Sequence, residues 1–216
     1  MPRPRTHDLD AVLDAAQKLA VDAGAAAVTV RALAEVTGVS NGAIYHAFGS
    51  RAGLLGRVWL RAATRFLAVQ SDAVDAALHS GQTPETAVDA IIAAADAPAA
   101  FALVSPQQGH FLLTVRRGEL LGDSDIPADI ADELRILDTR LTRLFITLST
   151  ALWGRSDRES VAVIKDCVVE LPTALLLRGR RDPDPATRAR LAAAVRGVLS
   201  IQLPDSPTTS TRKATS

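Results

Sequence analysis

Apolar residues recur at steps of three and four along most of this chain, a period that predicts amphipathic helices. Thr29, Ser40 and Ser50 each precede such a segment, and their hydroxyl side chains are of the type that caps a helix N-terminus. Gly24 and Gly38 each follow such a segment and suit the left-handed conformation that ends a helix. The helices expected in the first third of the chain cover residues 8–23, 29–38, 40–48 and 50–78.

The rest of the chain is also expected to be helical. The expected helices cover residues 84–96, 107–116, 128–152, 156–178 and 185–201. Pro98 and Pro106 are expected to interrupt the chain after the first of these, and Pro172 to kink or shorten the fourth, because proline lacks the N–H that a helix interior needs. The Ser-, Thr- and Pro-containing tail 204–216 is expected to be disordered. The pattern therefore predicts an all-α protein.

Composition narrows the class of protein. The single cysteine, Cys167, excludes an intrachain disulfide and a cysteine-rich metal site. No apolar run reaches the roughly 20 residues that span a bilayer, and the N-terminus lacks the apolar segment of a signal peptide. We therefore expect a cytoplasmic protein with no membrane partner.

The chain has no metal-ligand spacing, phosphate-binding glycine loop or nucleophile motif, so we expect no enzyme, no catalytic residue, no metal and no cofactor.

Charge is unevenly distributed although the formal net charge is zero. Residues 1–65 carry eight Lys and Arg against five Asp and Glu, whereas the remainder carries sixteen against nineteen. Chance variation accounts for a contrast of this size. A basic N-terminal part on an acidic body is the functional interpretation, and the charge contrast alone does not decide between the two.

The segment 29–51 has the spacing of a helix-turn-helix. Ala34 is the small residue that lets two helices cross, and Gly38 supplies the turn four residues later. Leu33, Val39 and Ile44 supply apolar contacts between the helices. An ordinary corner between two helices has similar spacing, so the polar residues of the second helix decide between the two interpretations.

That second helix is expected to present Asn41, Gly42, Tyr45 and His46 outward while Ile44 points inward. An asparagine can make two hydrogen bonds to adenine, a tyrosine can reach phosphate, and a glycine permits close approach of the backbone. A tyrosine beside a histidine and an asparagine is unusual for a merely solvated face. The pattern favours a helix that enters the major groove of DNA.

Phosphate contacts are expected around the same corner. Thr29 and Ser40 stand at helix starts, where free backbone N–H groups attract phosphate. Arg31 and Arg51 flank the corner and add positive charge. For each arginine, an ordinary surface position is an equally good interpretation.

The segment resembles the TetR family of bacterial transcriptional regulators over about residues 8–60. The matching residues are Thr29-Val30-Arg31, Leu33-Ala34, Gly38-Val39-Ser40, Gly42-Ala43-Ile44-Tyr45 and Phe48, followed by Leu54-Leu55. The resemblance implies that Asn41, Gly42 and His46 are base-reading positions. It implies that Thr29, Ala43 and Tyr45 contact the DNA backbone. Arg51 takes the place of the family's usual lysine, which keeps the charge but changes the donor geometry.

The resemblance also implies the organisation of the whole chain. We expect a three-helix helix-turn-helix DNA-binding domain at 1–50, a helical effector-binding and dimerisation domain at 51–203, and a disordered tail at 204–216. The implied protein is a homodimer formed through the last two helices. It binds a near-palindromic operator in double-stranded DNA, most simply as a repressor, and a small-molecule effector of unknown identity releases it.

The effector site is the least defined part of this expectation. The candidates are aromatic residues and polar residues beside apolar stripes, namely Phe66, Phe101, His110, Phe111, Asp138 and Phe145. An ordinary core with polar groups at its edge accounts for the same residues. A helical adaptor that binds protein through the same corner, without DNA, is the alternative function.

Overall fold

The structure is a computed structural model that describes residues 6–114, 127–177 and 184–203. The described residues are helical and contain no strand. The elements are α1 (Thr6–Ala23), η1 (Ala25–Ala27), α2 (Val30–Thr37), α3 (Asn41–Phe48), α4 (Arg51–His79), α5 (Pro84–Val104), α6 (Pro106–Thr114), α8 (Ala128–Trp153), α9 (Arg158–Lys165), η2 (Asp166–Glu170), η3 (Thr173–Leu177) and α10 (Pro185–Leu199). The predicted all-α class is confirmed, while the predicted tail 204–216 lies outside the described residues.

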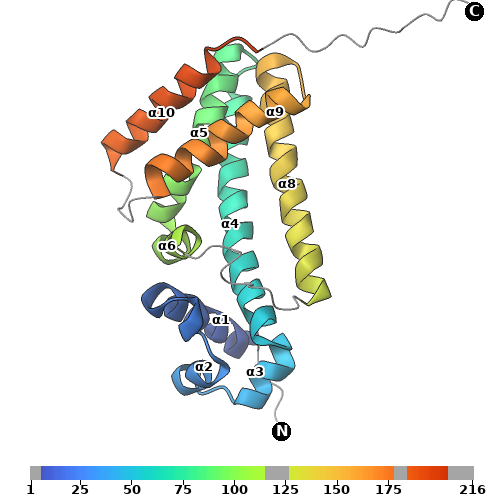
Figure 1. Ribbon diagram of the computed structural model, residues 1–216, viewed down its shortest axis with the longest axis vertical. Helices are drawn as coiled ribbons and strands as arrows, with labels where there is room; N and C mark the ends of the chain where they lie inside the picture. The colour runs from blue at the N-terminus through green and yellow to red at the C-terminus, as the bar shows by residue number, and fades with distance from the viewer. Residues whose placement is uncertain (1–5, 115–126, 178–183, 204–216) are drawn as a thin grey trace, which may run out of the picture.

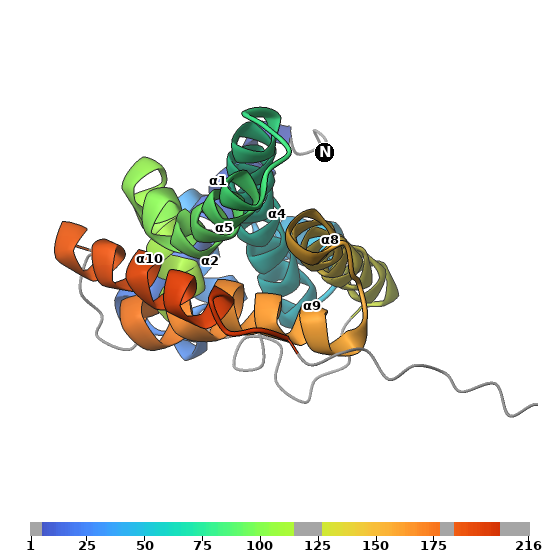
Figure 2. The same cartoon turned by 90° about the horizontal axis from the view of Figure 1, so that it is seen from above.

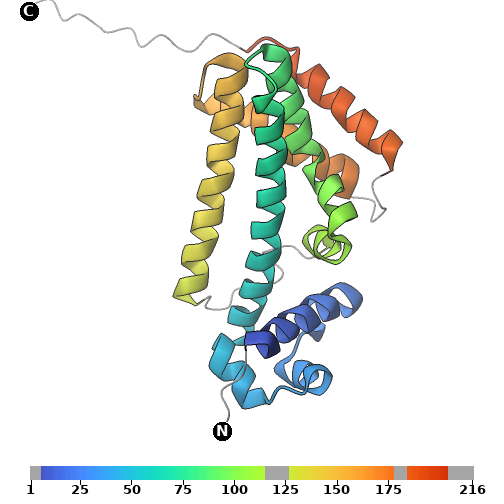
Figure 3. The same cartoon turned by 180° about the vertical axis from the view of Figure 1, so that it is seen from behind.

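The molecule is elongated, with α1, α2 and α3 at one end and α5, α9 and α10 toward the other (Figure 1). Helix α4 leaves the three-helix end and runs along the length of the body, and α8 runs beside it (Figures 1 and 3). Seen from above, α9 and α10 lie together along one side of the molecule (Figure 2). At about 1.5 Å per residue, the 29 residues of α4 are long enough to connect both ends of the molecule.

Helix α5 is longer than the sequence pattern predicts, because it continues through Pro98 to Val104. Proline at position 98 cannot donate to the carbonyl of Ala94 four residues earlier. In the structure the side-chain amide Nε2 of Gln70, on α4, donates to that carbonyl at 2.9 Å, and Gln70 is buried. The expected interruption at Pro98 was therefore wrong, because a side chain distant in sequence satisfies the carbonyl that proline leaves free.

The segment expected as one helix over 156–178 is helical from 158 to 177, but its first part, α9, is followed by the π-helical turns η2 and η3. These turns lie on either side of Pro172. Helical structure thus continues past the proline, with π-helical in place of α-helical hydrogen bonding on both sides of it. Cys167 in η2 has no exposed surface, and burial raises the pKa of its thiol to about 12.

Helix α5 is also long and apolar enough to cross a membrane by length and composition. Much of that apolar surface is instead packed inside the protein, since Ala90, Ile91, Ala94 and Phe101 are almost completely buried. The helix packs against both α4 and α10. Its hydrophobicity is that of a core helix, which makes it weak evidence for a membrane span.

Buried side chains form two clusters, one at each end of the molecule. The first, here called the head cluster, joins α1, α2, α3 and the first half of α4 to one residue of α6 and three of α8: Phe111, Ile130, Leu134 and Leu137. The second joins the far parts of α4 and α8 to α5, α9, η2, η3 and α10. The core that supports the α2–α3 corner thus includes residues well beyond the boundary expected at 50–51.

Candidate DNA-binding surface

The corner between α2 and α3 has the geometry that its sequence predicts. Gly38 has a φ of 71°, and its N–H donates to the carbonyl of Ala34 at 2.9 Å, which ends α2. Only glycine adopts this left-handed conformation without steric cost. Leu33 and Ile44 are almost completely buried and Phe48 is 8% exposed, so the apolar contacts between the helices are also in place.

Hydroxyl side chains cap the helices on both sides of this corner. The Thr29 hydroxyl accepts from the N–H of Ala32 at 3.1 Å, and the Ser40 hydroxyl accepts from the N–H of Ala43 at 3.2 Å. Each cap leaves neighbouring first-turn N–H groups free, because a helix N-terminus has four donors without intrahelical partners. These ends can therefore accept a phosphate.

The predicted polar face of α3 points to solvent. Asn41, Gly42 and His46 are exposed, Tyr45 is 55% exposed, and Ala43 is half-buried. Helix α3 lies at the tip of the three-helix end, where no other described element covers this face (Figure 1). The face is thus available to a macromolecule.

The two arginines of the corner are placed differently. Arg31 on α2 is 86% exposed and forms an ion pair with Glu35 at 3.0 Å. An exposed pair four residues apart contributes little to stability, so Arg31 is free to turn toward a phosphate. Arg51 instead directs its guanidinium back into the chain, where it donates to the backbone carbonyls of Val28 and Ala25.

Helix α4 connects this surface to the body through close contacts with α8 and α1. A Cβ added at Gly56 would lie 2.5 Å from Cγ2 of Ile130, so α8 approaches α4 closely there. Arg57 forms an ion pair with Asp129 at 2.6 Å, and Arg61 forms one with Asp14 of α1, also at 2.6 Å. The first turns of α4 are therefore held between the three-helix end and α8.

The structure brings only some of the predicted effector-site residues together. The rings of Phe66 and Phe101 meet edge to face with centroids 5.7 Å apart. Phe111 belongs to the head cluster and Phe145 to the second cluster, so these two rings lie in different cores. His110 and Asp138 are exposed.

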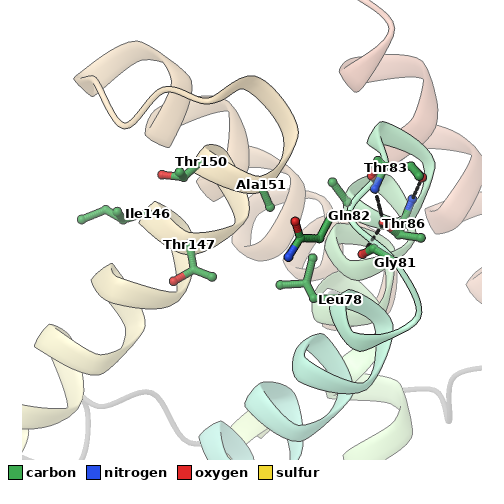
Figure 4. Close-up of a pocket in the computed structure, with 10 residues that line it drawn as sticks. Leu78, Gly81, Gln82, Thr83, Thr86, Ile146, Thr147, Thr150 and Ala151 are labelled. Atoms are coloured by element: carbon green, nitrogen blue, oxygen red, sulfur yellow. Dashed lines mark hydrogen bonds between the residues drawn. The ribbon is translucent and has the colours of Figure 1, made fainter.

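A cleft of about 620 Å³ opens between the α4–α5 turn and α8 (Figure 4). Its lining is mostly hydroxyl, amide and small apolar groups, and includes Leu78, Gln82, Thr86, Ile146, Thr147 and Thr150. A second cleft of about 330 Å³ follows the seam between α4 and α8, where Arg140 and Arg143 lie opposite Asp75. Thr147 lines both clefts, and none of the six predicted effector residues lines either.

Sequence reasoning missed these clefts because threonine and glutamine on exposed helix faces give no periodic signal. Their common location appears only when α8 packs beside α4. Among the residues that the structure describes, no group of three or more His, Cys, Asp or Glu is placed to hold a metal ion.

Comparison with known proteins agrees with this geometry. Residues 12–58 match the family model described as bacterial regulatory proteins, tetR family. No curated protein matches the chain. Among solved structures, PfmR of Thermus thermophilus, described as a TetR family transcriptional regulator, is 19% identical with a TM-score of 0.60 over 87% of this chain and 96% of its own.

Two further structures are similar in fold. A TetR-family transcriptional regulator from Streptomyces coelicolor is 20% identical with a TM-score of 0.57, over 89% of this chain and 97% of its own. FadR of Bacillus subtilis, solved in complex with stearoyl-CoA, is 16% identical with a TM-score of 0.59, over 88% of this chain and 95% of its own. Residues 12–58 thus match the DNA-binding segment of the tetR family of bacterial regulatory proteins, and the chain as a whole has the fold of TetR-family regulators.

Proposed function

We propose that the chain is a cytoplasmic, homodimeric repressor that binds a near-palindromic operator and releases it when a small molecule binds the body. The observation that carries this proposal is the outward polar face of α3, flanked by the capped N-termini of α2 and α3. In a dimer the two α3 helices would enter successive major grooves roughly 34–36 Å apart.

Within this proposal the contacts divide by chemistry. Asn41, Gly42 and His46 read bases, because they lie on the exposed face of α3. The phosphate contacts are Thr29, Arg31, Ser40, Ala43 and Tyr45, which occupy helix starts or exposed side positions. The DNA-binding unit and the body correspond to residues 1–50 and 51–203, although the two share the head cluster.

Dimerisation is proposed through the last helical segments, α9 to α10. Leu175 in η3 is 41% exposed and Ile201 just after α10 is 69% exposed, so apolar surface remains on this side of the molecule. Burial of such surface against a second copy is favourable. Sedimentation of the purified chain should give the mass of a dimer.

DNA binding is tested by its salt dependence. A dimer that neutralises roughly 6–10 phosphates should lose about 10³–10⁵ in affinity between 50 and 200 mM salt. The probe is a set of duplex fragments from the source genome, selected by binding. Absence of binding even at low salt would reject the repressor and favour a protein-binding adaptor.

Base reading by Asn41 makes a specific prediction. Asn41→Ala should lower affinity for the selected operator by about 1–3 kcal/mol and reduce the preference for operator over mixed-sequence DNA, since a bidentate contact discriminates between bases. Tyr45→Phe is the matched control, because removal of a phosphate contact should weaken binding to both duplexes equally. Both affinities are measured by fluorescence anisotropy. Equal weakening by Asn41→Ala on the two duplexes would contradict base reading.

The effector is proposed to lie between α4 and α8, in the two clefts that share Thr147. These helices meet again at the head, where Gly56 and Ile130 are in close contact. A ligand that separates them would therefore displace the first turns of α4 and the DNA-binding unit. The ligand must bind the released state more tightly, and typical couplings are about 1–3 kcal/mol.

Acyl-CoA thioesters are the first effectors to test, because FadR of Bacillus subtilis was solved in complex with stearoyl-CoA. A ligand at 100 times its dissociation constant should stabilise the folded chain by about 2.7 kcal/mol, seen as a higher melting temperature. Thr147→Phe should abolish this shift because its ring would obstruct both clefts at the residue they share, whereas Thr139→Phe, on α8 outside them, should keep it. A shift that survives Thr147→Phe but is lost in Phe66→Ala would place the effector beside Phe101 instead.

A further inference from the structure

We infer that Arg51 is a positioning residue for DNA binding rather than a phosphate contact. It ties the first residue of α4 to the connection between α1 and α2. The inference rests on the proposed DNA binding for its functional consequence, while the contact itself is structural.

The guanidinium of Arg51 makes two hydrogen bonds within the chain. Its Nε donates to the carbonyl of Val28 at 2.7 Å, and its Nη2 donates to the carbonyl of Ala25. These acceptors lie 23 and 26 residues earlier in the sequence. A guanidinium has a rigid planar fork, so two donors engaged together hold both the side chain and its acceptors in one orientation.

The two carbonyls belong to the short connection between α1 and α2. Residues Ala25 to Ala27 form the single turn η1, and Val28 is the extended residue that ends it. The side chain of Val28 is fully buried, which anchors the segment in the head cluster. The carbonyl of Ala25 already accepts from the N–H of Val28 at 3.2 Å, so Arg51 adds a second donor there. Arg51 also donates from α4 to the carbonyl of Val28, and a buried or partly buried carbonyl without a donor costs free energy.

The position of Val28 gives the contact its functional consequence. The next residue, Thr29, is the N-cap of α2 and one of the proposed phosphate contacts. The start of α2 is thus tied through Val28 to the first residue of α4. When the body displaces α4, this contact carries the displacement to the start of α2. The packing of α3 against α4 is a second route by which it reaches the DNA-binding unit.

A lysine at position 51 would not reproduce this arrangement. Its ammonium keeps the positive charge but lacks the planar fork that engages two carbonyls in a fixed geometry. For a phosphate contact, by contrast, a lysine is a good substitute because it acts as a point charge. The conservative variant therefore separates the two roles.

The test compares Arg51→Gln, Arg51→Lys and Arg31→Gln for binding to a mixed-sequence duplex of about 30 base pairs over 50–200 mM salt. If Arg51 positions the backbone, Arg51→Gln weakens binding but keeps the slope of log affinity against log salt, and Arg51→Lys does not restore affinity. Arg31→Gln is the matched control, and it should lower the slope by about 0.9 for each phosphate that the side chain no longer neutralises. A reduced slope in Arg51→Gln, with affinity restored by Arg51→Lys, would overturn the inference.

Amide hydrogen exchange supplies a readout that needs no DNA. The N–H of Val28 donates to Ala25, and the N–H of Leu33 donates to Thr29. In Arg51→Gln these amides should exchange roughly tenfold faster or more, because a hydrogen bond from a charged donor is removed next to them. Amides in the middle of α8 should be unchanged. Unchanged exchange at Val28 would overturn the inference whatever the binding result.

The two measurements keep this inference separable from the proposed function. If the wild-type chain binds no duplex, the proposed function fails and exchange alone decides the role of Arg51. If Arg51→Gln does not fold, the same exchange comparison is made with Arg51→Lys, which retains the charge and most of the side-chain length.

Discussion

Replacing Phe111 with alanine is expected to lower the free energy of unfolding by about 3–5 kcal/mol, the range for a fully buried phenylalanine. Phe111 has no exposed surface and lies in the head cluster, although α6 belongs to the body in sequence. Helix α6 packs against both α1 and α4. The cavity left by the ring would therefore lie beside the helices that hold the DNA-binding unit in place.

Urea denaturation followed by circular dichroism measures this effect. We expect one cooperative transition in the wild-type chain, because the head cluster joins the two parts of the molecule. Ile146→Ala is the control, since Ile146 is 39% exposed and its truncation should cost less than about 1 kcal/mol. A decrease of less than about 1 kcal/mol in Phe111→Ala, or a separate transition of the DNA-binding unit, would contradict shared packing.

Gly53→Ala is expected to destabilise the chain by about 1–3 kcal/mol and to weaken DNA binding, because overpacking forces neighbouring atoms to move. A Cβ at Gly53 would lie 2.2 Å from the carbonyl oxygen of Phe48 and 3.2 Å from Cγ of Pro127. The first neighbour is backbone at the end of α3, so the substitution must displace α3 from α4. That displacement would misalign the proposed recognition helix with the body.

A comparison of three glycines isolates this cause. Gly56→Ala should be milder than Gly53→Ala, because its close neighbour is the side-chain end of Ile130, which can move. Adding Ile130→Ala to Gly56→Ala should remove the clash, and a double-mutant cycle then measures the coupling. Gly42→Ala is the control for stability, since a Cβ there meets nothing within 4 Å. Melting temperatures that are equal in all three single variants would reject close packing at both Gly53 and Gly56.

Much of the candidate DNA-binding surface was predictable from local sequence. Thr29 and Ser40 accept hydrogen bonds from N–H groups three residues later, and Gly38 adopts the turn conformation that its type favours. These interactions involve residues within a few positions of one another, so residue type and spacing determine them. The outward direction of Asn41 and His46 follows from the helical period once Ile44 is buried.

The extent of the helices was predictable only where no distant residue intervened. The expected break at Pro98 was wrong because Gln70, on another helix, donates to the carbonyl that proline leaves free. No local rule contains that contact. The membership of Phe111 in the head cluster and the clefts beside Thr147 depend in the same way on how helices pack.

The sequence by itself therefore determined the all-α class, the helix caps and the polar face of α3, because each depends on neighbours along the chain. Tertiary structure alone decided where Arg51 points, since its acceptors lie 23 and 26 residues away. It also decided that the DNA-binding unit shares its core with α6 and α8. Packing brings distant residues together, and a periodic pattern records only which side of a helix is apolar, not what that side meets.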